Sequence, residues 1–179
     1  MTTFEEFKKD TVKKLQKKLN IKNINAVPKI QKVVVAIGIG SLATRKSLKD
    51  FDEFEKNIIK ITGQKPILRK SKKAISNFKL REGLPVMYQS TLRNRRAYDF
   101  LDRFVKLVLP RIRDFNGLSV KSFDGNGNMN IGIPNYNVFP ELTVEDVVNP
   151  IGIQITIVTS TKDNVKAKAL LEETGLIFK

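Results

Sequence analysis

The stretch from Pro66 to Leu92, PILRKSKKAISNFKLREGLPVMYQSTL, contains two strand patterns and no helical pattern between them. Its first residues, Pro66 to Ser71, predict a short strand, and Leu84 to Leu92 alternates as a half-buried strand does. The alternation separates Leu84, Val86, Tyr88, Ser90 and Leu92, expected to face inward, from Pro85, Met87, Gln89, Thr91 and Arg93. A strand that follows a strand without a crossover helix favours an α+β fold with a mostly antiparallel sheet.

The rest of the chain mixes helical and strand patterns around this pair. Amphipathic or apolar helices are predicted over residues 3–19, 47–63, 98–115 and 165–171. The second begins with a sequence that resembles a capping box at 47–50 and runs toward Gly63, and the third is expected to kink at Pro110. Further strands are predicted over 30–38, 128–133 and 151–159, and Asn126-Gly127 predicts a tight turn before the second of these. We expect one domain over residues 1–179, with helices packed on one face of the sheet and the other face left open.

Charge and composition limit the function. The 179 residues carry 33 Lys and Arg against 18 Asp and Glu, a net charge of +15, and they include no Cys and no His. Such an excess is typical of proteins that bind a polyanion. Without Cys and His, disulfides and thiolate metal sites are excluded and an enzyme is disfavoured. No apolar run is long enough to span a membrane, and no signal peptide is visible. We expect no catalytic residue, metal or cofactor.

One short motif points elsewhere. Gly38, Gly40 and Ala43 spell G-x-G-x-x-A after the predicted strand 30–38, the outline of a dinucleotide-binding turn. The second strand ends in Arg69, Lys70 and Ser71 rather than in an acidic residue, and a basic loop follows where a crossover helix is needed. We therefore favour a structural role, in which the glycines let another backbone approach the strand end or let the chain turn there.

Basic residues concentrate between Lys65 and Arg96, where Glu82 is the only acid. The cations are Lys65, Arg69, Lys70, Lys72, Lys73, Lys79, Arg81, Arg93, Arg95 and Arg96. Because the two strands and the loop between them carry this segment, we expect its cations to lie close together and to bind phosphate. Phe78 interrupts the loop, where either stacking on a base or burial in the core would account for it. Gln89, Thr91 and Arg93 are expected in line on the open face of the sheet, which suits RNA.

Seven segments occur in order along the chain and belong together: GQKP at 63–66, KAISNFKLREG at 73–83, TLR at 91–93, PRIRDFNGL at 110–118, SFDGNGN at 122–128, FPE at 139–141 and GIQITIVTSTK at 152–162. This ordered series resembles the bacterial-type large-subunit ribosomal protein five family. The series covers nearly the whole chain. The resemblance places the GIG turn at the glycine pair that ends the family's first strand.

The resemblance implies a structural constituent of the large ribosomal subunit in the cytoplasm, monomeric within the ribosome. Members hold 5S ribosomal RNA to 23S ribosomal RNA in the central protuberance. A basic loop contacts peptidyl-site transfer RNA, and a surface bridges to a small-subunit head protein. The 5S contacts are then expected at Gln64, Lys65, Gln89, Thr91 and Arg93. The loop, residues 72–83, would place Lys72, Lys73, Ser76, Asn77, Phe78, Lys79 and Arg81 near transfer RNA. Other ribosomal RNA contacts are expected at Arg69, Lys70, Arg95, Arg96, Arg111 and Arg113.

Two positions and one segment depart from the family pattern. Ala36 stands where an Asn is common, Gln154 where an Asp is common, and PNYN at 134–137 replaces a charged stretch. These departures put individual contacts in doubt. A free RNA-binding or assembly factor and, further behind, an NADP-linked enzyme remain the alternatives.

Overall fold

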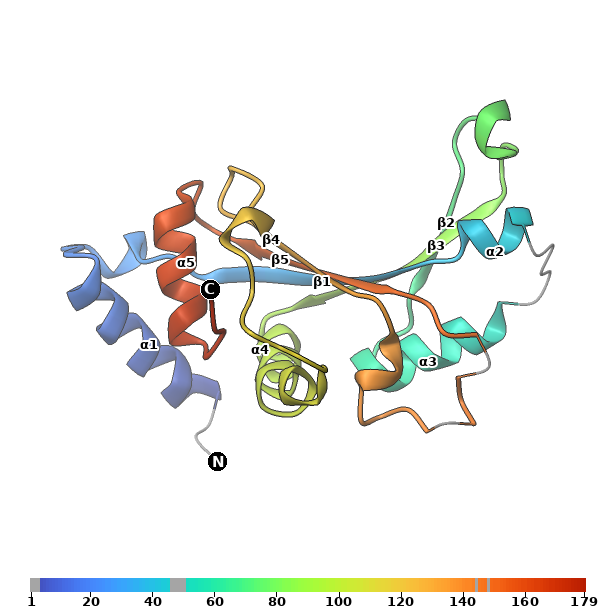
Figure 1. Cartoon of the computed structure of the whole chain (residues 1–179). Coiled ribbons are helices and arrows are strands. Elements are labelled where there is room, and N and C mark those ends of the chain that lie inside the picture. Colours follow the sequence, from blue (N-terminus) through green and yellow to red (C-terminus); the bar gives the residue numbers. More distant parts are fainter. Residues whose placement is uncertain (1–3, 46–50, 144, 148) are drawn as a thin grey trace. The chain divides into compact units, whose positions relative to one another are not determined.

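The computed structural model describes residues 4–45, 51–143, 145–147 and 149–179. Its strands are β1 (Ile30–Gly38), β2 (Ile67–Lys70), β3 (Pro85–Arg93), β4 (Met129–Ile133) and β5 (Ile153–Thr159). They form one antiparallel sheet in the order β2-β3-β1-β5-β4 (Figure 1). The α+β fold predicted from the sequence is confirmed.

The helices are α1 (Phe4–Lys18), α2 (Gly40–Arg45), α3 (Asp52–Thr62), α4 (Arg95–Arg103) and α5 (Asn164–Glu173). Local chemistry sets several of their ends. Acidic residues occupy the first turn of α3, where their negative charge interacts favourably with the positive end of the helix dipole. The helix ends at Gly63, which takes the left-handed conformation. The carboxylate of Asp163 accepts a hydrogen bond from the backbone N–H of Val165 and caps α5. The predicted capping box at 47–50 lies outside the described residues.

The chain divides into two compact units, each with its own core. Unit 1 comprises residues 1–33, 93–131 and 156–179, and unit 2 comprises residues 34–92 and 132–155. In unit 1, α1 packs against α5 and α4. In unit 2, α3 lies along one face of the strands (Figure 1), and its Phe54, Ile58 and Ile61 are at most 1% exposed.

The alternation predicted for β3 is confirmed in its central part. Tyr88, Ser90 and Leu92 are buried on one face, and Gln89 and Thr91 between them are half-buried on the other. Leu84 and Val86 face a less complete core and are only half-buried. Because the inward positions repeat every second residue, the polar positions are left together on the face that α3 does not cover.

The long helix predicted over 98–115 is shorter than expected. It begins at Arg95 as α4, continues as a π-helical turn over Phe104–Val108, and ends in a 3₁₀ turn over Leu109–Arg111. Pro110 therefore ends the helix rather than kinking it, because proline has no N–H for the helical ladder. Ile112 has already extended backbone, so the apolar pattern after it belongs to a loop.

The turn predicted at Asn126-Gly127 is confirmed and is built around Asp124. The Asp124 carboxylate accepts hydrogen bonds from the backbone N–H groups of Asn126 and Asn128, at 2.8 and 3.0 Å. Gly127 has φ +74°, and a Cβ there would collide with the carbonyl oxygen of Thr161. Both the backbone angle and the close neighbour therefore require glycine. None of the helices within the described residues combines the length and the apolarity that a membrane crossing needs.

Candidate nucleic-acid interface

Residues predicted to contact RNA meet on the open face of unit 2. β2 and β3 pair antiparallel with Ile67 opposite Gln89 and Arg69 opposite Met87, so these side chains share one face. The Arg69 Nε donates a hydrogen bond to Oε1 of Gln89 at 3.1 Å. This bond holds the guanidinium of the edge strand above the sheet with most of its donors still available.

Gln64 is fixed beside Thr91 in the same unit. Its side-chain amide donates to the backbone carbonyl of Thr91 at 3.2 Å. The bond uses the Thr91 backbone and not its hydroxyl, so the hydroxyl stays on the half-buried open face of β3. Lys65 follows Gln64, and its ammonium lies 3.4 Å from Glu55 with a side chain that is 80% exposed. The structure therefore brings together four of the five residues expected at the 5S contact.

The basic loop between β2 and β3 is a projection closed by backbone hydrogen bonds. Its base is closed by a hydrogen bond from the Ser71 N–H to the Leu84 carbonyl and another from the Gly83 N–H to the Ser71 carbonyl, and its tip by paired backbone bonds between Ile75 and Leu80. Every residue from 72 to 79 is exposed. Figure 1 shows the loop, in green, extending beyond the ends of β2 and β3. The prediction that this segment projects from the sheet is confirmed.

Phe78 lies at the loop tip and is 72% exposed. It ends a 3₁₀ turn over Ser76–Phe78, after which Lys79 takes the left-handed conformation with φ +52°. Burial in the core, one of the two alternatives for Phe78, is therefore wrong. An exposed ring flanked by Asn77 and Lys79 has the chemistry to stack on a base while the ammonium meets a phosphate.

Small residues leave a hollow on the open face of unit 2. Its volume is about 470 Å³, and Ala36, Gly38, Gly132 and Gly152 are among the residues that line it. A Cβ built on Gly38 or Gly132 would meet no atom within 4 Å. The hollow thus exists because these glycines lack side chains, and sequence reasoning missed it because the lining residues come from four strand regions, those of β1, β3, β4 and β5.

The structural reason proposed for the glycine pair is not supported. Neither Gly38 nor Gly40 has a positive φ, and a Cβ on Gly40 would sit 3.5 Å or more from Val86, which is ordinary contact. The backbone N–H of Ile39 bonds the carbonyl of Val86 at 2.8 Å and joins the strand end to β3. The glycine at 38 instead leaves the open face bare.

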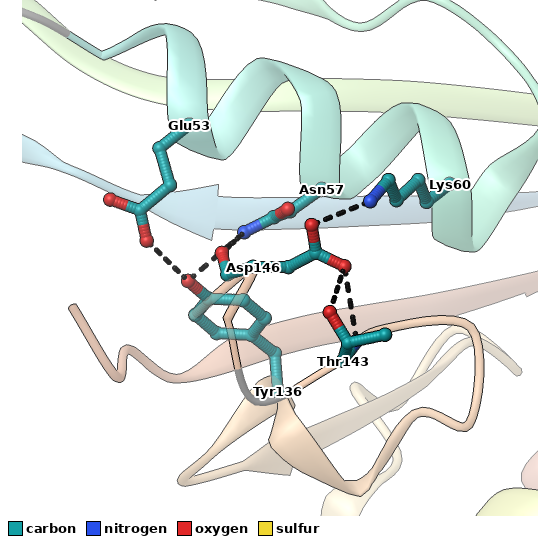
Figure 2. Close-up of polar contacts among 6 residues, drawn as sticks. All are labelled: Glu53, Asn57, Lys60, Tyr136, Thr143 and Asp146. Atoms are coloured by element: carbon teal, nitrogen blue, oxygen red, sulfur yellow. Dashed lines mark hydrogen bonds and ion pairs between the residues drawn. The ribbon is translucent and has the colours of Figure 1, made fainter. Parts of the chain in front are cut away.

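A polar network joins the segment between β4 and β5 to α3 in unit 2 (Figure 2). The Tyr136 hydroxyl lies between Glu53 and Asn57, at 3.4 Å from each, and donates to the carbonyl of Asn149 at 3.1 Å. Burial raises the pKa of Tyr136 to about 12, so its hydroxyl stays protonated and able to donate. This tyrosine belongs to the PNYN segment, which departs from the family's charged stretch.

Asp146 anchors the other end of the same segment. Its carboxylate accepts a 2.6 Å bond from the Lys60 ammonium and two bonds from Thr143, which together hold its pKa at about 2. Asn57 adds a 2.7 Å bond to the Asp146 carbonyl. The network fixes the loop that begins at Pro134, on the rim of the hollow.

The remaining candidate cations lie in unit 1. They are Arg93, Arg95, Arg96, Arg111 and Arg113, and all are exposed. Of the basic residues from 65 to 96, those up to Arg81 share unit 2, and Arg93, the last residue of β3, belongs with Arg95 and Arg96 to unit 1. Arg95 also lies 3.6 Å from Asp99, one helical turn away.

Comparison with known proteins gives a consistent result. The C-terminus of the ribosomal L5 family matches residues 85–178, and ribosomal protein L5 matches residues 23–81. A large ribosomal subunit protein uL5 from Halothermothrix orenii is 46% identical over 174 residues, covering 97% of this chain and 96% of that protein. The Fusobacterium nucleatum protein of that name is 48% identical over 168 residues, covering 94% and 91%, and the Thermotoga sp. protein is 43% identical over 178 residues, covering 98% and 94%.

Proposed function

The chain belongs to the ribosomal protein L5 family, and from that premise we propose that it attaches 5S ribosomal RNA to the large subunit through the open face of unit 2. As a structural protein of the large ribosomal subunit it is located in the cytoplasmic ribosome and is not an enzyme. The alternative of an NADP-linked enzyme is therefore wrong, and the family membership favours a ribosomal protein over the other alternative, a free RNA-binding or assembly factor.

One observation carries the proposal. Gln89 and Thr91 lie on a face of β3 that α3 leaves uncovered, Gln64 is hydrogen-bonded to the backbone of Thr91, and Arg69 is hydrogen-bonded to Gln89. Amide and hydroxyl groups can hydrogen-bond bases and ribose hydroxyls, whereas the guanidinium and nearby lysines neutralise phosphates. The bare hollow formed by Gly38, Gly132 and Ala36 adds space on this face for an RNA backbone.

The projecting loop has a separate role in this proposal. Lys72, Lys73 and Lys79 would neutralise phosphates of peptidyl-site transfer RNA, and Phe78 would stack on an exposed base. Support comes from the exposure of every residue from 72 to 79 and from the backbone bonds that close the loop into a hairpin-like projection. The bridge to a small-subunit head protein, the contact with 23S ribosomal RNA and the single copy per ribosome rest on the family resemblance.

Replacement of Thr91 by Ala tests the 5S site. The Gln64 bond goes to the Thr91 backbone, so it survives the change and the fold should be kept. We expect the free energy of binding to 5S RNA to become less favourable by about 1 kcal/mol or more, because the variant lacks the neutral hydroxyl that would hydrogen-bond the RNA.

The adjacent hydroxyl supplies the matched control. Ser90 is 1% exposed on the opposite face of the same strand, and its hydroxyl has no hydrogen-bond partner among the described residues. Ser90→Ala should therefore bind 5S RNA as the parent protein does. Equal binding by Thr91→Ala and the parent would contradict the proposed site.

A further inference from the structure

The chain contains two Asn-Gly sequences, Asn116-Gly117 and Asn126-Gly127, and both lie in unit 1. Asparagine is a thermolabile residue, because the backbone nitrogen of the next residue attacks its side-chain amide carbon. The attack is easiest when glycine follows, since glycine has no Cβ to hinder the approach. Both asparagines are exposed, so any difference in their reactivity has to come from how the structure holds the two glycines.

The structure holds Gly127 by both of its backbone polar groups. Its N–H donates to Oδ1 of Asn164 at 2.9 Å, and its carbonyl accepts a 2.7 Å bond from the hydroxyl of Thr159. Gly127 is also buried, with the carbonyl of Thr161 close against it. The nitrogen therefore has to leave its bond to Asn164 and move within a tightly packed turn before it reaches the side chain of Asn126.

Gly117 lacks this restraint. Its N–H has no acceptor among the residues that the structure describes, and none of these residues bonds the side-chain amide of Asn116. Asn116 lies in a loop, outside helices and strands. The reacting nitrogen and the reacting side chain are thus both without a hydrogen bond that must break first.

We propose that Asn116 is a modification site, the one of the two Asn-Gly sequences that deamidates in the folded protein. The backbone nitrogen of Gly117 gives its proton to water and forms a bond to Cγ of Asn116. The side-chain nitrogen takes up a proton and leaves as ammonia, and a five-membered succinimide ring remains. Water then adds to either ring carbonyl and opens the ring to aspartate or isoaspartate. The reaction needs no oxidant or reductant, and it is independent of the proposed function because no RNA takes part.

The products alter the attachment of the C-terminal segment. The N–H of Leu118 donates to the carbonyl of Ile177 at 2.7 Å, and the carbonyl of Leu118 accepts a 3.1 Å bond from the N–H of Lys179. Isoaspartate at position 116 routes the backbone through its side-chain carbon and so lengthens the chain just before this pairing. Deamidation should therefore loosen the two bonds, and either product adds a negative charge to the loop.

The test follows both asparagines in the full chain by mass spectrometry of its peptides. The protein is incubated in water labelled with heavy oxygen, which enters only molecules that deamidate during the incubation, and is then digested in ordinary water. The chain unfolded in guanidinium chloride gives the reference rates. Two variants change the group that holds the Gly127 N–H: Asn164→Ala removes the acceptor oxygen, whereas Asn164→Asp keeps one. Thermal melting checks that both variants are folded.

In the unfolded chain the two sites should react at similar rates. In the folded parent, Asn116 should react about tenfold faster than Asn126, the rate factor that corresponds to one hydrogen bond broken before the reaction. Asn164→Ala should raise the rate at Asn126, and Asn164→Asp should leave it low. Equal rates at the two sites in the folded parent, or a faster reaction at Asn126, would overturn the inference, and this comparison decides even if Asn164→Ala fails to fold. A folded Asn164→Ala variant with the parent's rate at Asn126 would overturn it as well.

Discussion

Removal of the three loop lysines separates the two RNA contacts proposed for unit 2. Lys72, Lys73 and Lys79 are exposed on the projection, and the structure shows no acidic partner for them among the described residues. Replacing all three with Ala should therefore leave the fold intact. Because the loop extends beyond β2 and β3, the variant should bind 5S RNA with the parent's affinity and the parent's salt dependence.

The size of the effect follows from counterion release. Each lysine that contacts a phosphate contributes about 1 to the slope of log affinity against log salt, so three contacts contribute about 3. In intact ribosomes that carry the variant, peptidyl-site transfer RNA should bind more weakly. The slope of its log affinity against log salt should fall by up to about 3. Filter binding measures the affinity of the isolated protein for labelled 5S RNA, and separately the binding of labelled transfer RNA to ribosomes that carry the variant.

The opposite outcome is equally well defined. If the variant loses 5S affinity with a slope change of about 3, the loop belongs to the 5S interface and the separation of roles is wrong. The variant carrying Lys106→Ala, Lys166→Ala and Lys168→Ala removes the same charge from lysines that already pair with acids. It controls for a general effect of net charge on both RNAs.

Three further predictions concern stability. Gly127→Ala should lower the free energy of unfolding by about 2 to 5 kcal/mol, because the new side chain would meet both a positive φ and a backbone atom in its way. Gly63 also has a positive φ but open space around it, so Gly63→Ala should lower the free energy of unfolding by only about 1–2 kcal/mol. Equal losses for the two variants in urea denaturation would refute the packing argument. Ser90→Ala should raise stability by about 1 kcal/mol by removing an unsatisfied buried hydroxyl, and a lower melting temperature would show that the hydroxyl has a partner. Because the folded pKa of Asp146 lies at about 2, below its usual 3.8, the stability that its carboxylate contributes should be lost as pH falls from about 4 to 2. The Asp146→Asn variant should therefore be less stable than the parent at neutral pH, and its stability should fall less in acid. Identical acid denaturation curves for the variant and the parent would show that Asp146 does not contribute to this pH dependence.

Periodicity made much of the fold predictable. The alternation around Tyr88 identified β3 and the side that faces the core, and the bounds of β1 matched the predicted 30–38 because both ends of its apolar run are marked by polar or glycine residues. The end of α4 was missed because the apolar pattern continues past Pro110, although proline had removed a ladder hydrogen bond.

The site was less predictable because it depends on contacts between distant segments. Phe78 has no periodic neighbours, so only the structure separates an exposed ring from a buried one. The hollow needs both Gly38 of β1 and Gly132 of β4, which are separated by β5 in the sheet, and nothing in either local sequence indicates the other. Likewise, the bond from Gln64 to the Thr91 backbone joins residues 27 positions apart.

Site-specific crosslinking in purified ribosomes tests the central assignment most directly. A photoreactive amino acid is incorporated in place of Thr91 in one preparation and in place of Phe78 in another, and the crosslinked RNA is identified by primer extension. The account predicts crosslinks to 5S RNA from position 91 and to peptidyl-site transfer RNA from position 78. Absence of 5S crosslinks at position 91, or crosslinks from both positions to the same RNA, would contradict it.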